Sequence, residues 1–237
     1  MNARCLPLLA GVLCLSSCVF HTTATGPVQY DARAIERDAS EHVRVELNMG
    51  AGELRVSGGT QKLMQGDFTY NVASWKPSIR YSSTGSLGSL TIEQPGGSSV
   101  HVGNVTYQWD LRLNKEVPLD MKVHFGAGKA RLDLGSLALR SVEVAMGVGE
   151  LDMDLRGTPK RSYSVRVQGG VGEATIRLPG DVGVYAEAAG GIGEISARGL
   201  RHEDGHWVND AYEDSRVRIR LDVHGGIGAI HLLAGTD

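Results

Sequence analysis

The chain has 237 residues, of which 41% are apolar and 22% are charged, and its formal net charge is −3. This composition is typical of a globular protein with one sizeable core, and it lacks the strong basic bias that is typical of nucleic-acid binding. All three cysteines lie within the first 18 residues, so the remainder has no disulfide, no thiol nucleophile and no cysteine metal site.

The first 18 residues have the pattern of a bacterial lipoprotein signal. Arg4 precedes a mostly apolar run, Cys5 to Leu15, which is too short to span a bilayer. The run ends in Leu15-Ser16-Ser17-Cys18, which resembles the lipobox, where the cysteine is diacylated and becomes the first residue. An ordinary cleaved signal peptide is the alternative. The resemblance implies a membrane anchor on Cys18, and Val19 in place of an aspartate implies the outer membrane.

Residues 19–40 are polar, have no clear apolar period and contain the breaker pair Gly26-Pro27. They predict a flexible tether between the lipid and a folded domain over residues 41–237.

The folded part is repetitive. A Gly-x-Gly triplet occurs six times, and several copies are flanked by alternating apolar and polar residues, which predict strands. Each unit is therefore predicted to form a strand, a glycine corner and a second strand. The six triplets begin at Gly50, Gly126, Gly147, Gly170, Gly191 and Gly226.

Antiparallel hairpins or a parallel solenoid could use this unit. Corresponding positions form wholly apolar columns, for example Val123, Val144, Val167, Ala188 and Val223. An outward column reads Lys122, Glu143, Arg166, Glu187 and Asp222, and its first four members alternate in sign. Ion pairing between strands stacked in chain order explains this alternation, whereas hairpins do not. We therefore expect an all-β fold, a single-stranded parallel β-helix.

The sequence between the fifth and sixth triplets is longer than that between the preceding three pairs of triplets. It contains an insertion at about residues 201–214, with Trp207 and Tyr212. We expect the insertion to cover the C-terminal end of the solenoid or to leave it open for self-association or partner docking. Asp154 and Arg177, on outward columns, are further candidate interaction residues.

The repeated corners, together with Gly205-His206-Trp207-Val208-Asn209 before the last strand, resemble the toast-rack family of adhesin-like proteins. This family includes the extracytoplasmic part of LiaF-type envelope-stress proteins. The resemblance implies a β-helix fold and a role in envelope sensing or adhesion. LiaF-type proteins usually carry membrane helices, whereas this chain has a lipobox.

No catalytic, cofactor or metal site is expected. The triplets lack the third glycine and the following helix of a dinucleotide-binding loop. Glu150, Glu173 and Glu194 could hold a calcium ion, and His202 and His206 a zinc ion, but solvated turns explain both sets. No acid–base pair stands out from the surface charge, as a glycosidase would need.

The sequence thus predicts a non-enzymatic, membrane-anchored envelope module that binds a partner protein or a cell-wall polymer and does not bind nucleic acid. A structural spacer lipoprotein and a carbohydrate-active β-helix enzyme are the alternatives.

Overall fold

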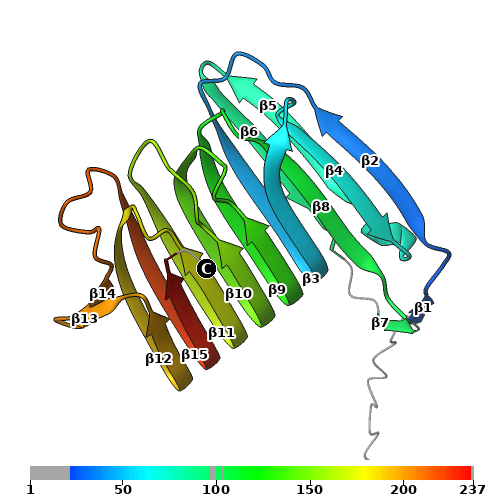
Figure 1. The fold of residues 1–237 in the computed structure, drawn as a ribbon. Coiled ribbons are helices and arrows are strands. Elements are labelled where there is room, and N and C mark those ends of the chain that lie inside the picture. Colours follow the sequence, from blue (N-terminus) through cyan, green and yellow to red (C-terminus); the bar gives the residue numbers. More distant parts are fainter. Residues whose placement is uncertain (1–21, 97–99, 103, 236–237) are drawn as a thin grey trace, which may run out of the picture.

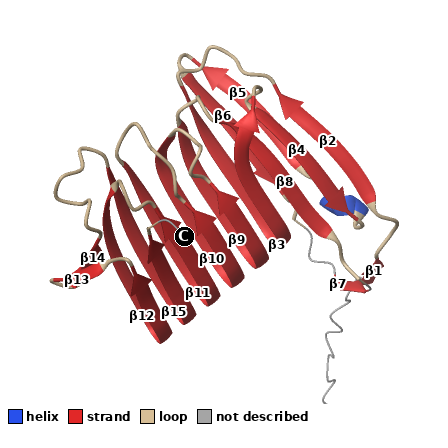
Figure 2. Cartoon of the chain, viewed as in Figure 1, coloured by secondary structure: helices blue, strands red, loops and turns tan. Residues whose placement is uncertain are grey.

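The computed structural model describes residues 22–96, 100–102 and 104–235, and these are almost entirely β-structure (Figures 1 and 2). Cys18 and the predicted signal lie outside the described residues. The elements are β1 Thr22–Ala24, β2 Gln29–Ile35, β3 His42–Thr60, β4 Met64–Tyr70, the 3-10 turn η1 Ala73–Trp75, β5 Ser78–Thr84, β6 Leu87–Glu93, β7 Val100–Val102, β8 Tyr107–Asn114, β9 Leu119–Asp133, β10 Leu139–Asp154, β11 Tyr163–Leu178, β12 Gly183–Arg198, β13 Arg201–Glu203, β14 His206–Val208 and β15 Arg218–Ala234.

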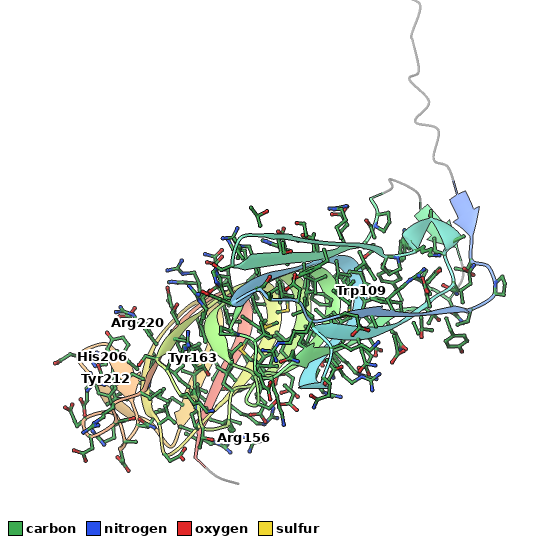
Figure 3. All side chains as sticks on the ribbon, turned by 90° about the horizontal axis from the view of Figure 1, so that it is seen from above. Trp109, Arg156, Tyr163, His206, Tyr212 and Arg220 are labelled. Atoms are coloured by element: carbon green, nitrogen blue, oxygen red, sulfur yellow. The ribbon has the colours of Figure 1, made fainter. Side chains whose placement is uncertain are left out.

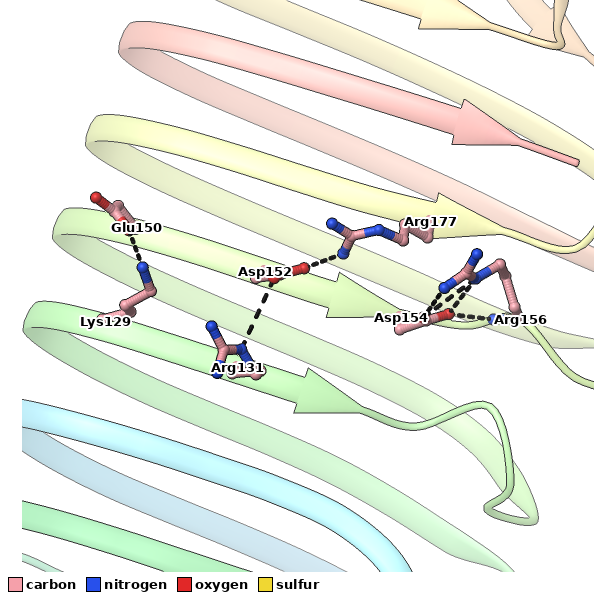
Figure 4. A network of polar contacts seen from close by, with 7 residues as sticks. All are labelled: Lys129, Arg131, Glu150, Asp152, Asp154, Arg156 and Arg177. Carbon is pink, nitrogen blue, oxygen red and sulfur yellow. Dashed lines mark hydrogen bonds and ion pairs between the residues drawn. The ribbon is translucent and has the colours of Figure 1, made fainter. Parts of the chain in front are cut away.

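Each long strand folds back on itself at its Gly-x-Gly corner, so that a first arm before the corner and a second arm after it lie in two layers (Figures 1 and 4). The alternating side chains of both arms point into the space between the layers. Val144 on the first arm of β10 and Met153 on its second arm are 2% and 0% exposed. One core therefore runs through the whole stack between the two layers.

The corners require glycine because of both backbone conformation and crowding. Gly149 has φ +135°, and a Cβ there would lie 1.9 Å from the carbonyl oxygen of Gly128 in the preceding strand. An L-residue rarely adopts this φ, and no side chain fits so close to a backbone oxygen. The same geometry recurs at the other corners, which explains the repeated motif.

The long strands stack in parallel and in register, in the order β3, β9, β10, β11, β15, β12. The prediction of parallel stacking and of apolar columns is confirmed. The prediction that the strands stack in chain order is wrong, because β15 lies between β11 and β12. Residue size explains the order. The inward Leu221, Val223, Ile230 and Leu232 of β15 are all at most 4% exposed, whereas β12 offers mainly alanines at the equivalent positions. Placing the strand with larger apolar side chains inside buries more apolar surface.

The outward charged column changes accordingly. Lys122 pairs with Glu143 at 3.0 Å, as expected. Arg166 pairs with Asp222 of β15 at 3.4 Å instead of with Glu187. Glu187 lies beside Asp222 in the register and contacts Arg220 at 3.6 Å. The alternation of sign therefore continues in the spatial order of strands as far as Asp222 and ends there.

The N-terminal part widens the stack. β6 pairs with the first arm of β3 and β8 with its second arm, and β4 pairs antiparallel with β8. β2 pairs antiparallel with β4 along its whole length. The predicted tether over residues 19–40 is therefore wrong for residues 29–35. β2 is an edge strand in which only Ile35 packs on the core, so its sequence shows no apolar alternation.

Candidate functional site at the C-terminal end of the stack

The end of the stack is β12, and its two arms differ in how their outer edges are covered. β14 pairs with the first arm at Tyr185 and Ala186. In the described part of the chain, the second arm has a strand partner only on the β15 side. Its inward residues Ile195 and Ala197 are only partly buried. An uncovered strand edge presents unpaired N–H and C=O groups, which can pair with an added strand. We call residues 191–198 the open arm.

An apolar cavity lies behind the open arm. The inward position just before each corner holds Met49, Phe125 and Met146 in β3, β9 and β10. In β11, β15 and β12 the same position holds Gly169, Gly225 and Gly190. The missing side chains leave a cavity of about 60 Å³, lined by Met146, Val167, Ala174, Ile195, Val223 and Ile230 together with the corner glycines. We call it the glycine cavity.

The glycine cavity can accept side-chain atoms. A Cβ on Gly169 would meet nothing closer than 3.9 Å, and one on Gly190 would meet Ile195 at 3.7 Å. Neither residue has a positive φ, so both positions tolerate other residues. The corner residue Ile192 is 71% exposed at this end. The open arm thus combines an unpaired strand edge, an exposed aliphatic side chain and an apolar cavity.

The insertion predicted at residues 201–214 forms the β13–β14 hairpin and a turn that returns to β15. Trp207 is partly buried against the core and lies opposite Ala186. The insertion therefore covers the first arm of β12 and not its second arm. Trp207 acts here as packing for the hairpin.

A buried asparagine, the last residue of the Gly205-His206-Trp207-Val208-Asn209 stretch, holds the insertion in place. Asn209 is 3% exposed. Its side-chain amide donates to the carbonyl of Val182 at 2.7 Å, and its side-chain oxygen accepts from the N–H of Val184 at 2.9 Å. Only the burial reveals this role, because an asparagine in a loop ordinarily indicates a turn.

Aromatic and arginine side chains gather on the outer face of the same end (Figure 3). Tyr185 stacks on His206 at 4.5 Å and lies 6.0 Å from Tyr212. Arg220 lies over Tyr185 at 5.1 Å and Arg218 over Tyr212 at 4.8 Å. These contacts fasten the insertion to the stack, so Tyr212 contributes to a cluster that joins β12, β14 and β15.

The two other candidate residues, Asp154 and Arg177, are register neighbours on β10 and β11, but each pairs elsewhere (Figure 4). Arg177 pairs with Asp152, and Asp154 binds Arg156 at 2.7 Å. Burial opposes ionisation of Asp154, but its hydrogen bonds with Arg156 outweigh burial and lower its pKa. Both charges are thus already neutralised by partners within the chain, which favours a structural role.

A chain of polar contacts crosses the second arms. Ser196 Oγ lies 2.7 Å from His231 Nδ1, and His231 Nε2 lies 3.6 Å from a Glu173 carboxylate oxygen. The order of groups resembles a serine hydrolase triad. The Glu173 contact is long and its side chain is 57% exposed, so the carboxylate is weakly coupled to the imidazole.

Two metal sites were considered from the sequence. Among the described residues there is no group of three or more histidine, cysteine, aspartate or glutamate side chains placed to hold a metal ion. Glu150 instead pairs with Lys129 at 2.6 Å, and the His202 ring lies 4.9 Å from the Trp207 ring.

Comparisons with known proteins agree with this architecture. The family described as the N-terminal domain of toast_rack, DUF2154, matches residues 24–177, and the family described as cell wall-active antibiotics response LiaF, C-terminal, matches residues 127–232. No curated protein matches the chain.

Among solved structures, a "putative cell adhesion protein" from Clostridium sporogenes is 35% identical, with a TM-score of 0.85 over 89% of this chain and 100% of that chain. A "putative adhesin" from Bacteroides fragilis is 9% identical, with a TM-score of 0.33 over 89% of this chain and 100% of that chain. The resemblance drawn from the glycine corners is confirmed, and the chain belongs to the toast-rack family, with a LiaF-like C-terminal region.

Proposed function

We propose that this chain is a non-enzymatic, lipid-anchored envelope module that docks an extended segment of an envelope partner against the open arm of β12. The observation that carries the proposal is the unpaired second arm directly in front of the glycine cavity. A strand added at this edge gains backbone hydrogen bonds, and an apolar side chain on it can enter the cavity. Membership of a family with LiaF-like domains supports a role in the envelope.

A photo-crosslinking amino acid placed at Ser196 in cells tests this docking. We expect adducts from Ser196, on the edge strand, and none from Thr175, which occupies the same column one strand beyond β15 inside the stack. Gly169→Met should abolish the adducts, because its side chain fills the glycine cavity as Met146 does in β10. Equal adducts from both positions, or adducts that persist in Gly169→Met, would contradict docking at the open arm. Absence of adducts would favour the structural spacer.

The anchor is the second part of the proposal. No helix among the described residues is long and apolar enough to cross a membrane. We propose that Cys18 carries the lipid and holds the domain at the outer membrane, since acyl chains contribute about 0.8 kcal/mol per buried CH₂. Cys18→Ala should abolish labelling by an alkyne fatty acid and release the protein from the membrane fraction, whereas Cys14→Ala should leave both unchanged. Full labelling of Cys18→Ala would refute the lipid anchor.

We also propose that the arms and their return loops form a regular single-stranded parallel β-helix through β9, β10 and β11. The in-register pairing of these three strands supports this finer description.

A further inference from the structure

A second groove lies far along the stack from the open arm. It has a volume of about 720 Å³ and crosses the second arms of β3, β9 and β10 just after their corners. We call it the corner groove. Its lining includes Gly128 and Gly149 on the stack, Lys129 and Glu150 beside them, and Trp75 and Tyr107 on the side of β8. Its size is within the range of small-molecule sites, about 300–1,000 Å³.

The aromatic side of the corner groove is rigidly built. The rings of Trp75 and Tyr107 meet edge to face, with centroids 5.4 Å apart. The Tyr107 hydroxyl donates to the Trp75 carbonyl at 2.8 Å. Burial raises the pKa of Tyr107, so the phenol stays protonated and keeps this hydrogen bond. Trp75 is mostly buried against the core, and the remaining part of its ring lines the groove in a fixed position.

The charges around the corner groove cancel within the chain. Lys129 pairs with Glu150 at 2.6 Å, and Glu53 pairs with Arg55 at 3.4 Å. These two pairs contribute no net charge, which favours a neutral ligand over an anionic polymer. Their side chains still offer hydrogen-bond donors and acceptors at the surface, as does the exposed Gln108.

The corner groove cannot bind a peptide by strand addition. Its glycines belong to strands with a neighbour on each side, because β9 lies between β3 and β10, and β10 lies between β9 and β11. Recognition must therefore use side chains and ring stacking. A sugar chain has this chemistry, since its C–H face packs on an aromatic ring while its hydroxyls and amides form hydrogen bonds.

We propose that the corner groove binds a neutral glycan chain of N-acetylated sugars. The indole of Trp75 packs against a sugar face, and Lys129, Glu150 and Gln108 bind its hydroxyl and amide groups. Val105, which is 44% exposed, and Ala51 provide the apolar contact for an acetamide methyl group. This site is separate from the open arm, so glycan binding and partner docking can succeed or fail independently.

Titration of the full chain in detergent with chitohexaose, a neutral N-acetylated hexasaccharide, tests the proposal by calorimetry. We expect saturable binding that Trp75→Ala weakens by roughly tenfold or more. Trp207→Ala is the matched control and should bind as the unmodified chain does. Val105→Glu introduces a bulky charge at the exposed rim of the groove and should also weaken binding, which guards against misfolding of Trp75→Ala.

Three results with chitohexaose would overturn the glycan proposal. The first is no binding of chitohexaose at millimolar concentration. The second is that Trp75→Ala and Val105→Glu bind it as tightly as the unmodified chain does. The third is that Trp207→Ala loses as much affinity as Trp75→Ala does. Tighter binding of polygalacturonate, an anionic glycan without acetamide groups, would also overturn it in favour of an anionic polymer.

Discussion

Replacing Val144 with Asp should remove most of the stability of the fold. Val144 is 2% exposed and lies in register between Val123 and Val167. The substitution would bury a carboxylate among aliphatic side chains with no cation to pair with it, and it would also remove apolar contacts. The cost of these two effects is on the order of 4 kcal/mol or more, against a typical domain stability of about 5–15 kcal/mol. Urea unfolding followed by circular dichroism measures the change.

The neighbouring residue provides the control. Glu143 points outward and pairs with Lys122, and the two side chains are 49% and 45% exposed. Solvent screens such a pair, so Glu143→Ala should cost less than about 1 kcal/mol. If both substitutions had small and equal effects, the assignment of inward and outward columns would be wrong.

Replacing Gly172 with Ala should also be strongly destabilising. Gly172 has φ +140°, and a Cβ would lie 1.8 Å from the carbonyl oxygen of Gly149. The corner must therefore shift away from its neighbour, which disrupts the hydrogen bonds on both sides of the strand. We expect a loss of about 3 kcal/mol or more in the free energy of unfolding, and a lower melting temperature in a thermal scan.

Gly169→Ala is the matched control for this corner. It makes the same chemical change three residues earlier, at a position with no positive φ and with no atom within 3.9 Å of the new Cβ. It should leave stability unchanged or raise it by about 0.4–1 kcal/mol, because alanine restricts the unfolded chain. A similar loss in both variants would show that the glycine cavity has no room for an added atom.

The open arm and the corner groove differ in how far the sequence could reveal them. When the repeats are aligned, Gly169 occupies the position that Met146 holds in the preceding repeat. The glycine cavity could therefore have been predicted from the sequence. Trp75 and Tyr107 lie outside the repeats, and only the tertiary structure brings them beside the corners of β9 and β10.

Local rules are enough to predict the repeating unit and the side chains that it turns inward. Glycine at each corner follows from a backbone conformation that other residues rarely adopt, and alternation of apolar residues fixes which side chains of each arm point inward. These rules act within one repeat, so the corners, the apolar columns and the place of the insertion could all be predicted.

The order of neighbouring strands, in contrast, depends on packing across the whole stack. Backbone hydrogen bonds between parallel strands are the same whatever the side chains, so β15 and β12 could each pair with β11. The 199–217 segment is long enough to let β15 pass β12. The larger buried side chains of β15, including Leu221 and Ile230, then favour the interior position. The alanine-rich β12 is left at the edge of the stack. The open arm therefore results from differences in side-chain volume and not from the alternation of apolar residues.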